Sequence, residues 1–527
     1  MTAPKRITVL DTTLRDGAQR EGISLSVKDK VRIALKLDEL GIAYIEGGWP
    51  GSNPKDAEFF VQIKRATLRH AKIAAFGSTR RVGVRVEEDE NVRTLLAAET
   101  PVAVIVGKSS PMHVTEVLGT TLAENLAMIR DTVGYLKAKG LEVLFDAEHF
   151  FDGYKLDPAY ALETLRAAAE AGADRLVLCD TNGGTLPSEV SRIVAAAVAA
   201  FPGKSIGMHA HNDTGVAVAN TLLAVEAGAD HVQGTMNGYG ERCGNADLTA
   251  VIPNLQLKMG YQVLANGDLT LLTATSRFVS EIANLRPDDY APYVGYSAFA
   301  HKAGLHVNAL MKNGHTYQHI DPSLVGNKTR VLVSELAGRS NILHKLTELA
   351  LEVELSADEI RRLANRIKDL ESRGFQFEGA DGSFELLVRR AQPGYTPPFE
   401  VLDFLVLVEK RADKEILAEA TVKARVNGTV MHTAAEGDGP VHALDKAMRK
   451  ALLPFYPQLE AVQLTDYKVR ILDPQSATAA LTRVLIDASD GQRSWTTVGS
   501  SPNIIEASFQ ALIDSLELPL LRRASAG

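Results

Sequence analysis

The chain has 527 residues, 45% of them hydrophobic and 23% charged, and this globular composition excludes disorder as the main state. Its 57 basic and 65 acidic residues give a formal charge of −8 with no long basic run, so we expect no nucleic-acid partner. Two cysteines, Cys179 and Cys243, together with the lack of any apolar stretch of signal-peptide or membrane-spanning length, indicate a cytoplasmic protein without a membrane partner.

Short β-rich runs recur at regular intervals through the first half of the chain, each followed by a segment with helical spacing. The eight runs are residues 7–10, 44–47, 73–76, 102–106, 143–145, 176–178, 206–209 and 231–234. After the first run, Ser26 and Asp29 can cap a helix over residues 26–40. Eight strand–helix repeats predict a (β/α)8 TIM barrel over residues 1–275. An open parallel sheet with some strands misassigned is the alternative.

Beyond the predicted barrel the strand pattern fades, and residues 276–373 are expected to form one or two small helical subdomains. Ser356 followed by Glu359 is a capping box that begins another helix, and Arg373 with Gly374 is expected to end it. The alternating pattern that follows predicts a third, α+β domain over residues 374–527.

Two stretches of this third domain resemble each other. Asn427-Gly428 is followed by GDGP at residues 437–440, and Asp490-Gly491 is followed by GSSP at residues 499–502. Each stretch predicts a hairpin turn, a glycine-rich loop and then a helix. A duplicated β/α unit of this kind suggests a regulatory domain that senses a ligand or dimerises. Ordinary turns that are similar by chance are the alternative.

The sequence HAHND ends the seventh predicted strand. His209 and His211 are two residues apart, so both imidazoles point to the same side of the strand and can share a metal ion. The carboxyl ends of barrel strands are also where barrel active sites lie. We therefore favour a metal site over a structural histidine pair.

Barrel closure brings further candidate ligands beside these histidines, because strand eight neighbours both strand seven and strand one. The first strand ends in DTTLRDG, which offers Asp11, Arg15 and Asp16, and the loop after strand eight offers Glu241 and Asn245. Such a mixture of donors suits Mn²⁺, Mg²⁺, Zn²⁺ or Co²⁺. Vacant coordination positions would make the ion a Lewis acid. Alternatively, Asp16 pairs only with Arg15 or a nearby lysine.

Other strand ends are polar as well: Glu46 follows strand two, Glu148 strand five, and Asp180-Thr181 strand six. Buried carboxylates are costly unless they are paired or coordinated. Each of these groups is therefore expected either to belong to the substrate or metal site or to hold a loop in place by hydrogen bonds. Arg15 has a planar guanidinium that can bind a carboxylate or stabilise an alkoxide.

Three motifs, DTTLRDGAQ, HAHND and GERCGNADL, resemble the DRE-TIM metallolyases. This family includes the Claisen-condensing 2-isopropylmalate, homocitrate and citramalate synthases. The resemblance covers nearly the whole chain, including FAHKAGLH, TYQHIDP and the duplicated C-terminal unit. Residues 18–56 are most similar to the longer type of (R)-citramalate synthase.

The resemblance implies a role for each matching residue. The implied metal ligands are Asp16, His209, His211 and Asn245. Arg15 would face the 2-oxo acid, with Thr181 at its carboxylate and Glu46 as a further substrate-binding residue. Glu148 is similar to the family's active-site glutamate, although FDAEHF departs from the usual surroundings.

The helical subdomain of the family contributes a histidine and a tyrosine, which His306 and Tyr317 resemble. In the family these residues often enter the barrel of the partner subunit, which implies a domain-exchanged homodimer. The implied reaction is acetyl-CoA plus pyruvate plus water giving (R)-citramalate and CoA, on the route to isoleucine. Pyruvate would chelate the ion, and His306 would remove the methyl proton of acetyl-CoA with help from Glu148 or Tyr317.

Several alternatives remain at this point. A 2-isopropylmalate synthase is the nearest, since its acceptor differs from pyruvate by two methyl groups and one methylene is worth only about 1 to 3 kcal/mol of discrimination. A homocitrate synthase, a C–C lyase, an amidohydrolase and a non-catalytic metabolite sensor are more distant possibilities. The C-terminal domain implies feedback by a branched-chain amino acid, and isoleucine fits a citramalate route.

Overall fold

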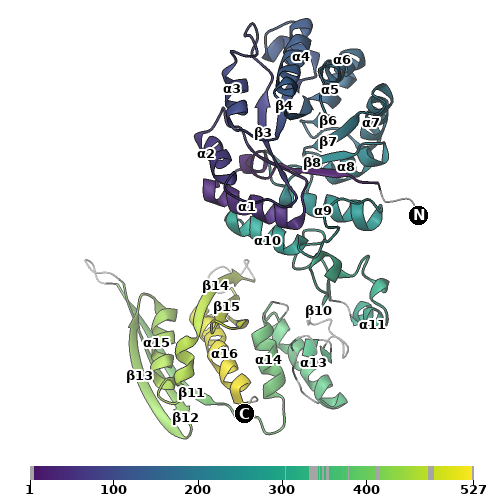
Figure 1. The fold of residues 1–527 in the computed structure, drawn as a ribbon. Helices are drawn as coiled ribbons and strands as arrows, with labels where there is room; N and C mark the ends of the chain where they lie inside the picture. Colours follow the sequence, from purple (N-terminus) through teal and green to yellow (C-terminus); the bar gives the residue numbers. More distant parts are fainter. Residues whose placement is uncertain are drawn as a thin grey trace. The chain divides into compact units, whose positions relative to one another are not determined.

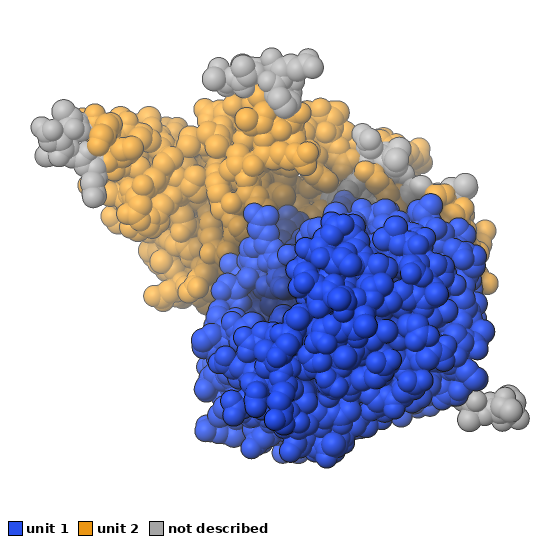
Figure 2. Space-filling view, turned by 90° about the horizontal axis from the view of Figure 1, so that it is seen from above, with its two compact units in different colours: residues 1–299, 320–328 blue, residues 300–319, 329–527 orange. Residues whose placement is uncertain are grey.

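The structure is a computed structural model that describes residues 5–302, 304–331, 355–377, 379–410, 416–472 and 480–524, together with residues 342, 343, 345, 346, 349 and 351. It divides into two compact units. The first consists of Met1–Phe299 and Ile320–Lys328, and the second of Ala300–His319 and Thr329–Gly527. Figure 2 shows the first unit in blue and the second in orange. None of the helices in the described ranges combines the length and apolar character that a membrane span requires.

The first unit is built around a closed barrel of eight parallel strands in sequence order (Figure 1). The strands are β1 (Thr8–Asp11), β2 (Tyr44–Gly48), β3 (Lys72–Ser78), β4 (Val102–Lys108), β5 (Glu142–Glu148), β6 (Arg175–Asp180), β7 (Ser205–Ala210) and β8 (His231–Gly234). β1 pairs with β8, Leu10 opposite Gln233, and this pairing closes the ring. The predicted TIM barrel is therefore confirmed, and the open-sheet alternative is wrong.

Helices surround the barrel. They are α1 (Val27–Leu40), α2 (Pro54–Ile63), α3 (Glu90–Ala97), α4 (Leu122–Ala138), α5 (Phe150–Leu156), α6 (Pro158–Glu170), α7 (Pro187–Ala200), α8 (Ala217–Glu226), α9 (Leu248–Pro253) and α10 (Leu272–Ile282). The predicted cap of α1 is present, because Ser26 accepts from the Asp29 N–H and the Asp29 carboxylate accepts from the Ser26 N–H.

The barrel interior is filled by apolar side chains at its base and becomes polar at the carboxyl ends of the strands. The buried cluster inside the barrel includes Leu10, Tyr44, Phe76, Val104 and Leu144. Because side chains alternate along a strand, the next inward positions fall at the strand ends. The packed base thus holds the strands rigidly, and with them the polar side chains at the barrel mouth.

Among the described residues, the second unit begins with two very short strands and three α-helices. They are β9 (Ala300–His301), α11 (Gly304–Lys312), β10 (Arg330–Val331), α13 (Ala357–Ser372) and α14 (Asp381–Arg390). β9 and β10 pair in parallel, which the sequence did not predict because each strand has only two residues. The predicted capping box of Ser356 and Glu359 is confirmed. α13 ends at Ser372 with Arg373 as its C-cap residue, followed by Gly374 with a φ of 92°.

The C-terminal part contains the predicted duplication. Its first copy is a sheet of β11 (Phe399–Glu409), β12 (Leu417–Val426) and β13 (Thr429–Gly437), followed by α15 (Pro440–Leu452). Its second copy is a sheet of β14 (Gln463–Ile471), β15 (Thr482–Ser489) and β16 (Ser494–Ser501), followed by α16 (Ile504–Ala524). The turns at 427–428 and 490–491 join hairpins as predicted.

Packing crosses the boundary that we placed at residue 373. Leu363 and Ile367 of α13 share a buried cluster with Phe384 of α14 and Val498 of β16. A cut at this position would expose that cluster. The three-part division at residues 275 and 373 therefore stays a prediction, whereas the chain's contacts separate into two units.

Candidate metal centre

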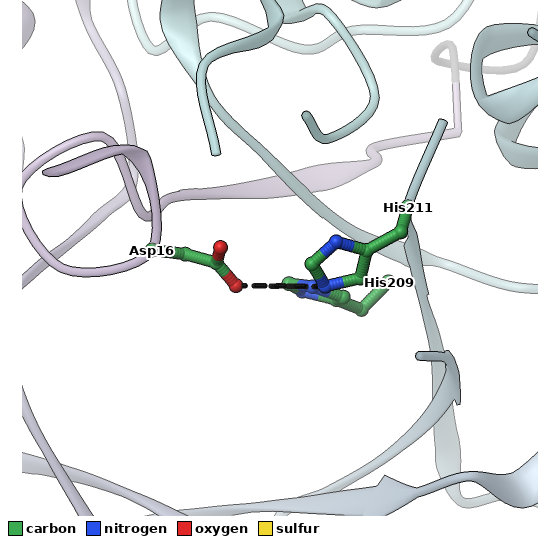
Figure 3. A group of neighbouring side chains, drawn as sticks. All are labelled: Asp16, His209 and His211. Atoms are coloured by element: carbon green, nitrogen blue, oxygen red, sulfur yellow. Dashed lines mark hydrogen bonds and ion pairs between the residues drawn. The ribbon is translucent and has the colours of Figure 1, made fainter. Parts of the chain in front are cut away.

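Asp16, His209 and His211 converge at the carboxyl ends of the barrel strands (Figure 3). One ligand atom from each lies within 4.8 Å of those of the other two. Oδ2 of Asp16 is 3.6 Å from Nε2 of His209 and 3.7 Å from Nε2 of His211. All three residues are buried. The structure therefore brings together three of the four ligands that the sequence predicted around a shared point.

Two barrel strands hold these side chains. His209 lies in β7 and His211 immediately follows that strand, so both rings point inward from the same edge. Asp16 lies in the tight turn after β1, where its N–H donates to Oγ1 of Thr12 at 3.3 Å. The turn is closed by the Gly17 N–H, which donates to the Thr12 carbonyl at 3.0 Å.

Asn245 completes the predicted set. Residues 211 and 245 form an isolated antiparallel bridge, so the loop after β8 lies against the end of β7. The amide Nδ2 of Asn245 donates to Oδ1 of Asp16 and to the Tyr239 carbonyl, both at 3.0 Å. Its Oδ1 is buried and has no hydrogen-bond partner among the described residues. A buried amide oxygen without a donor, beside a carboxylate and two imidazoles, fits a divalent cation.

Glu241, the other candidate from this loop, is not part of the group. Its side chain is 60% exposed and lies 3.7 Å from Arg242. Asp11, the remaining carboxylate of the first strand end, is buried and accepts from the Thr13 N–H at 2.8 Å. Its side chain therefore caps the turn, and sequence spacing alone did not separate it from Asp16.

The electrostatics of the group favour a cation-binding protonation state. Burial raises the pKa of Asp16, but the charges of Arg15 and the two histidines outweigh burial and lower it to about 2. Burial, together with the neighbouring His211, lowers the pKa of His209 to about 4. At neutral pH the carboxylate is therefore ionised and the His209 imidazole neutral, which are the forms that ligate metals.

Arg15 lies beside the group and is held in one position. Its Nε donates to Glu46 at 2.7 Å, its Nη1 is 3.3 Å from Asp16, and its guanidinium lies 4.0 Å above the Phe76 ring. Glu46 is fully buried and also accepts from Oγ1 of Thr12 at 2.5 Å. In this structure Glu46 orients Arg15, and its substrate-binding role stays a prediction.

A cavity of about 740 Å³ opens over these residues. Glu148 lines it and forms an ion pair with Lys108 at the neighbouring end of β4. Thr181 also lines it, and its Oγ1 accepts from the His149 N–H at 2.9 Å. The cavity thus joins the metal group to two of the residues that the sequence assigned to substrate and catalysis.

His306 and Tyr317 belong to the second unit. Both are exposed, and their rings are stacked with centroids 4.2 Å apart. They are not among the residues that line the cavity. Their catalytic roles stay predictions.

Three polar residues that face the barrel interior were not among the predicted site residues: Lys108, Asp146 and Gln233. Burial, reinforced by the charge of Glu46, raises the pKa of Asp146 to about 8. Gln233 bridges Asp146 and His209. Period-two alternation could have found two of them, because Asp146 lies two residues before Glu148 and Gln233 two residues after the inward-facing His231.

Nearly the whole chain is similar to known proteins. Residues 6–279 match the family described as HMGL-like, residues 293–374 the homocitrate synthase post-HMGL domain-like family, and residues 378–519 the LeuA allosteric (dimerisation) domain. The chain is 52% identical to the (R)-citramalate synthase of Aquifex aeolicus, over 99% of both chains. It is 54% identical to that of a Synechocystis species, over 98% of this chain and 97% of the relative.

More distant relatives carry another name. The chain is 31% identical to the 2-isopropylmalate synthase of Methanocaldococcus jannaschii, over 99% of this chain and 96% of the relative. The relatives named (R)-citramalate synthase and those named 2-isopropylmalate synthase both match this chain along its full length. They differ in their percentage identity to it.

Proposed function

This chain belongs to the (R)-citramalate synthase family, and from that premise we propose that it condenses acetyl-CoA with pyruvate and water to give (R)-citramalate and CoA. The observation that carries the proposal is full-length identity above 50% to relatives of that name, joined to a buried carboxylate–histidine group at the barrel mouth. The relatives named 2-isopropylmalate synthase are about twenty percentage points less identical, 31% against 52%. That gap favours pyruvate as the acceptor.

A divalent cation would be held by Asp16, His209, His211 and Asn245. When bound, it supplies Lewis-acid polarisation of the acceptor's oxygens. Mn²⁺, Mg²⁺, Zn²⁺ and Co²⁺ all suit this mixture of oxygen and nitrogen donors. The buried Oδ1 of Asn245, which lacks a donor among the described residues, supports this assignment.

The cavity residues would bind and activate the substrates. Arg15, fixed by Glu46 and Asp16, presents its remaining N–H groups to the keto oxygen of pyruvate, and stabilises the alkoxide that forms there. Thr181 binds the pyruvate carboxylate. Removal of a proton from the acetyl methyl group leaves an enolate that attacks the keto carbon. The alkoxide then takes up a proton to become the hydroxyl of the product, and water cleaves the thioester to a carboxylic acid and releases CoA.

The proton acceptor would come from the second unit. We assign this step to His306, assisted by Glu148 or Tyr317. The ring of Tyr317 is stacked on that of His306, which supports a joint role. Because the family pattern places this pair at the partner's barrel, we propose a homodimer with exchanged segments. Exposed apolar side chains along β11, among them Leu405 and Leu407 at 67% and 54% exposure, support a dimer contact, but not the exchange itself.

The C-terminal duplicated domain would bind an effector. It matches the LeuA allosteric (dimerisation) domain, and isoleucine fits feedback on a citramalate route in the cytoplasm. Isoleucine should inhibit CoA release by the full-length enzyme more strongly than leucine or valine at equal concentration. Inhibition by leucine alone would assign the effector to a different branched-chain route.

The substrate assignment is tested by measuring CoA release with pyruvate, 2-oxoisovalerate and 2-oxoglutarate in turn. We expect pyruvate to give the highest kcat/KM, with 2-oxoisovalerate at least about tenfold lower, since each methyl group of the acceptor carries about 1 to 3 kcal/mol. Preference for 2-oxoisovalerate would make the chain a 2-isopropylmalate synthase, and preference for 2-oxoglutarate a homocitrate synthase.

A further inference from the structure

Two buried polar side chains lie behind the metal group and connect it to β5. Nδ1 of His209 is 2.9 Å from Oε1 of Gln233 on β8, and Nε2 of Gln233 donates to Oδ1 of Asp146 on β5 at 3.0 Å. The exposed fractions are 4% for His209, 1% for Gln233 and 3% for Asp146. This chain of contacts starts at His209 and continues into the barrel interior through Gln233 and Asp146, which the reaction outlined above does not use.

The contacts dictate which nitrogen of His209 carries its proton. An amide oxygen accepts hydrogen bonds and cannot donate, so Nδ1 of His209 must be the donor. The two ends of an amide have the same shape, and only a partner decides which end faces the histidine. In this structure Asp146 is that partner: its Oδ1 accepts from the amide nitrogen, and the amide oxygen faces His209.

The other nitrogen of His209 is thereby left with a free lone pair. Nε2 of His209 faces the metal group, 3.3 Å from Nε2 of His211 and 3.6 Å from Asp16. His211 differs, because its Nδ1 is buried and lacks a hydrogen-bond partner among the described residues. Of the two histidines, only His209 is therefore held by a side chain on its far side.

We propose that Gln233 and Asp146 are positioning residues that hold His209 as the tautomer whose Nε2 is ready to bind a divalent cation. The inference rests on the proposed metal site and extends it to two residues outside the proposed ligand set; Asp146 also lines the cavity. Partners that orient a metal-binding histidine are typically worth about 10 to 100-fold in metal affinity. Gln233 acts directly on the imidazole, and Asp146 acts through Gln233.

The experiment measures Mn²⁺ affinity in metal-free, full-length protein, by the electron paramagnetic resonance signal of free Mn²⁺ and without substrates. Gln233→Leu and Asp146→Leu should bind Mn²⁺ about 10 to 100-fold more weakly than the wild type. Asp146→Asn retains an accepting oxygen of the same reach and should restore affinity to within about threefold. His231→Gln, at an inward position two residues earlier on β8, is the matched control and should bind normally.

A second readout follows the tautomer itself. In metal-free protein labelled with ¹⁵N-histidine, solid-state spectra should show a His209 resonance with protonated Nδ1, assigned by its loss in His209→Asn. Gln233→Leu should convert part of it to the other tautomer. A fold defect alone would not produce this exchange between the two nitrogens. Should Gln233→Leu fail to fold, the Asp146→Leu and Asp146→Asn pair carries the comparison.

The outcomes separate this inference from the metal site on which it rests. Wild-type protein that fails to bind Mn²⁺, or an Asp16→Ala variant that binds it normally, would overturn both. Tight binding that depends on Asp16 but is unchanged in Gln233→Leu and Asp146→Leu would overturn the positioning role alone. Weak binding by Asp146→Asn equal to that of Asp146→Leu would also overturn it, because the accepting oxygen would then not matter.

Discussion

At the scale of single residues, the barrel mouth is a set of opposite charges that restrain one another. Arg15 contacts both Glu46 and Asp16, and the three groups are almost inaccessible to solvent. Charges buried in this way are stable only when paired. One consequence is that Arg15 needs no rearrangement to meet a negative charge that develops in the cavity.

Arg15→Ala should therefore lower kcat more than it raises the KM for pyruvate. The loss of one donor to a developing oxyanion typically costs about 10² to 10³ in kcat, and we expect a loss in this range. Arg15→Lys keeps the charge but loses the planar fork, so it should recover only part of the rate. Steady-state kinetics of both variants check this, and an unchanged kcat in Arg15→Ala would remove Arg15 from the mechanism.

His231 gives a prediction on pH and stability. It lies at the base of the barrel, where Nδ1 is 3.0 Å from Oγ1 of Thr8, and burial, together with the charge of Arg175, lowers its pKa well below the usual value. In the unfolded chain the His231 imidazole therefore binds a proton near pH 6.5, whereas in the folded chain it stays neutral at that pH. Its contribution to stability is present above that pH and is lost as the pH falls.

His231→Gln should flatten this dependence. Between pH 7.5 and 5.5 the wild type should lose about 1.4 kcal/mol more of its free energy of unfolding than the variant does, because a tenfold change in a protonation equilibrium has that value. Denaturant unfolding of metal-free protein at the two pH values measures the difference. Equal losses in wild type and variant would mean that His231 takes up its proton in the folded chain as readily as in the unfolded chain.

At the scale of elements, the loop from Gly238 to Asn245 depends on glycine. A Cβ on Gly240 would lie 2.2 Å from Nδ2 of Asn245, too close for both to keep their places. Gly240→Ala should therefore displace Asn245 and weaken Mn²⁺ binding by about tenfold or more. Gly215→Ala, in the loop after β7, is the matched control: its φ is 74° but a Cβ there meets no atom within 4 Å.

Gly215→Ala should bear the backbone strain of a positive φ and still bind Mn²⁺ as the wild type does. Titration of both variants with Mn²⁺ tests the difference. Equal Mn²⁺ affinities for Gly240→Ala and the wild type would show that metal binding does not depend on the present position of Asn245.

Elements set by local sequence patterns were predictable, whereas those set by contacts between residues far apart in the sequence were not. All eight strands and the cap at Ser26 were predictable because alternation and capping are local patterns. The convergence of Asp16 with His209 followed from barrel closure. The link from His209 through Gln233 to Asp146 was not predicted, because it joins strands five, seven and eight by side-chain contacts alone. β9 and β10 were missed because two residues make no pattern.

At the scale of the whole molecule, the two units must cooperate for the proposed reaction to proceed. The proposed metal ligands lie in the first unit and His306 in the second. If each site takes its His306 from the partner subunit, two inactive variants can complement each other. Asp16→Ala and His306→Ala should each be inactive alone, but a mixture that has exchanged subunits should regain activity, because one of its two sites is intact.

Subunit exchange is confirmed separately, with a different affinity tag on each variant. A mixed dimer that forms and remains inactive would contradict exchange of the segment that carries His306. Activity in the His306→Ala variant alone would remove this residue from proton transfer.

The most direct measurement of the central claim couples metal binding to catalysis. Metal-free enzyme is titrated with Mn²⁺ while CoA release from acetyl-CoA and pyruvate is followed. Activity should be absent without metal, rise in proportion to bound ion and saturate at one ion per chain, and Asp16→Ala should neither bind nor react. Full activity in metal-free protein, or saturation without dependence on Asp16, would contradict the account.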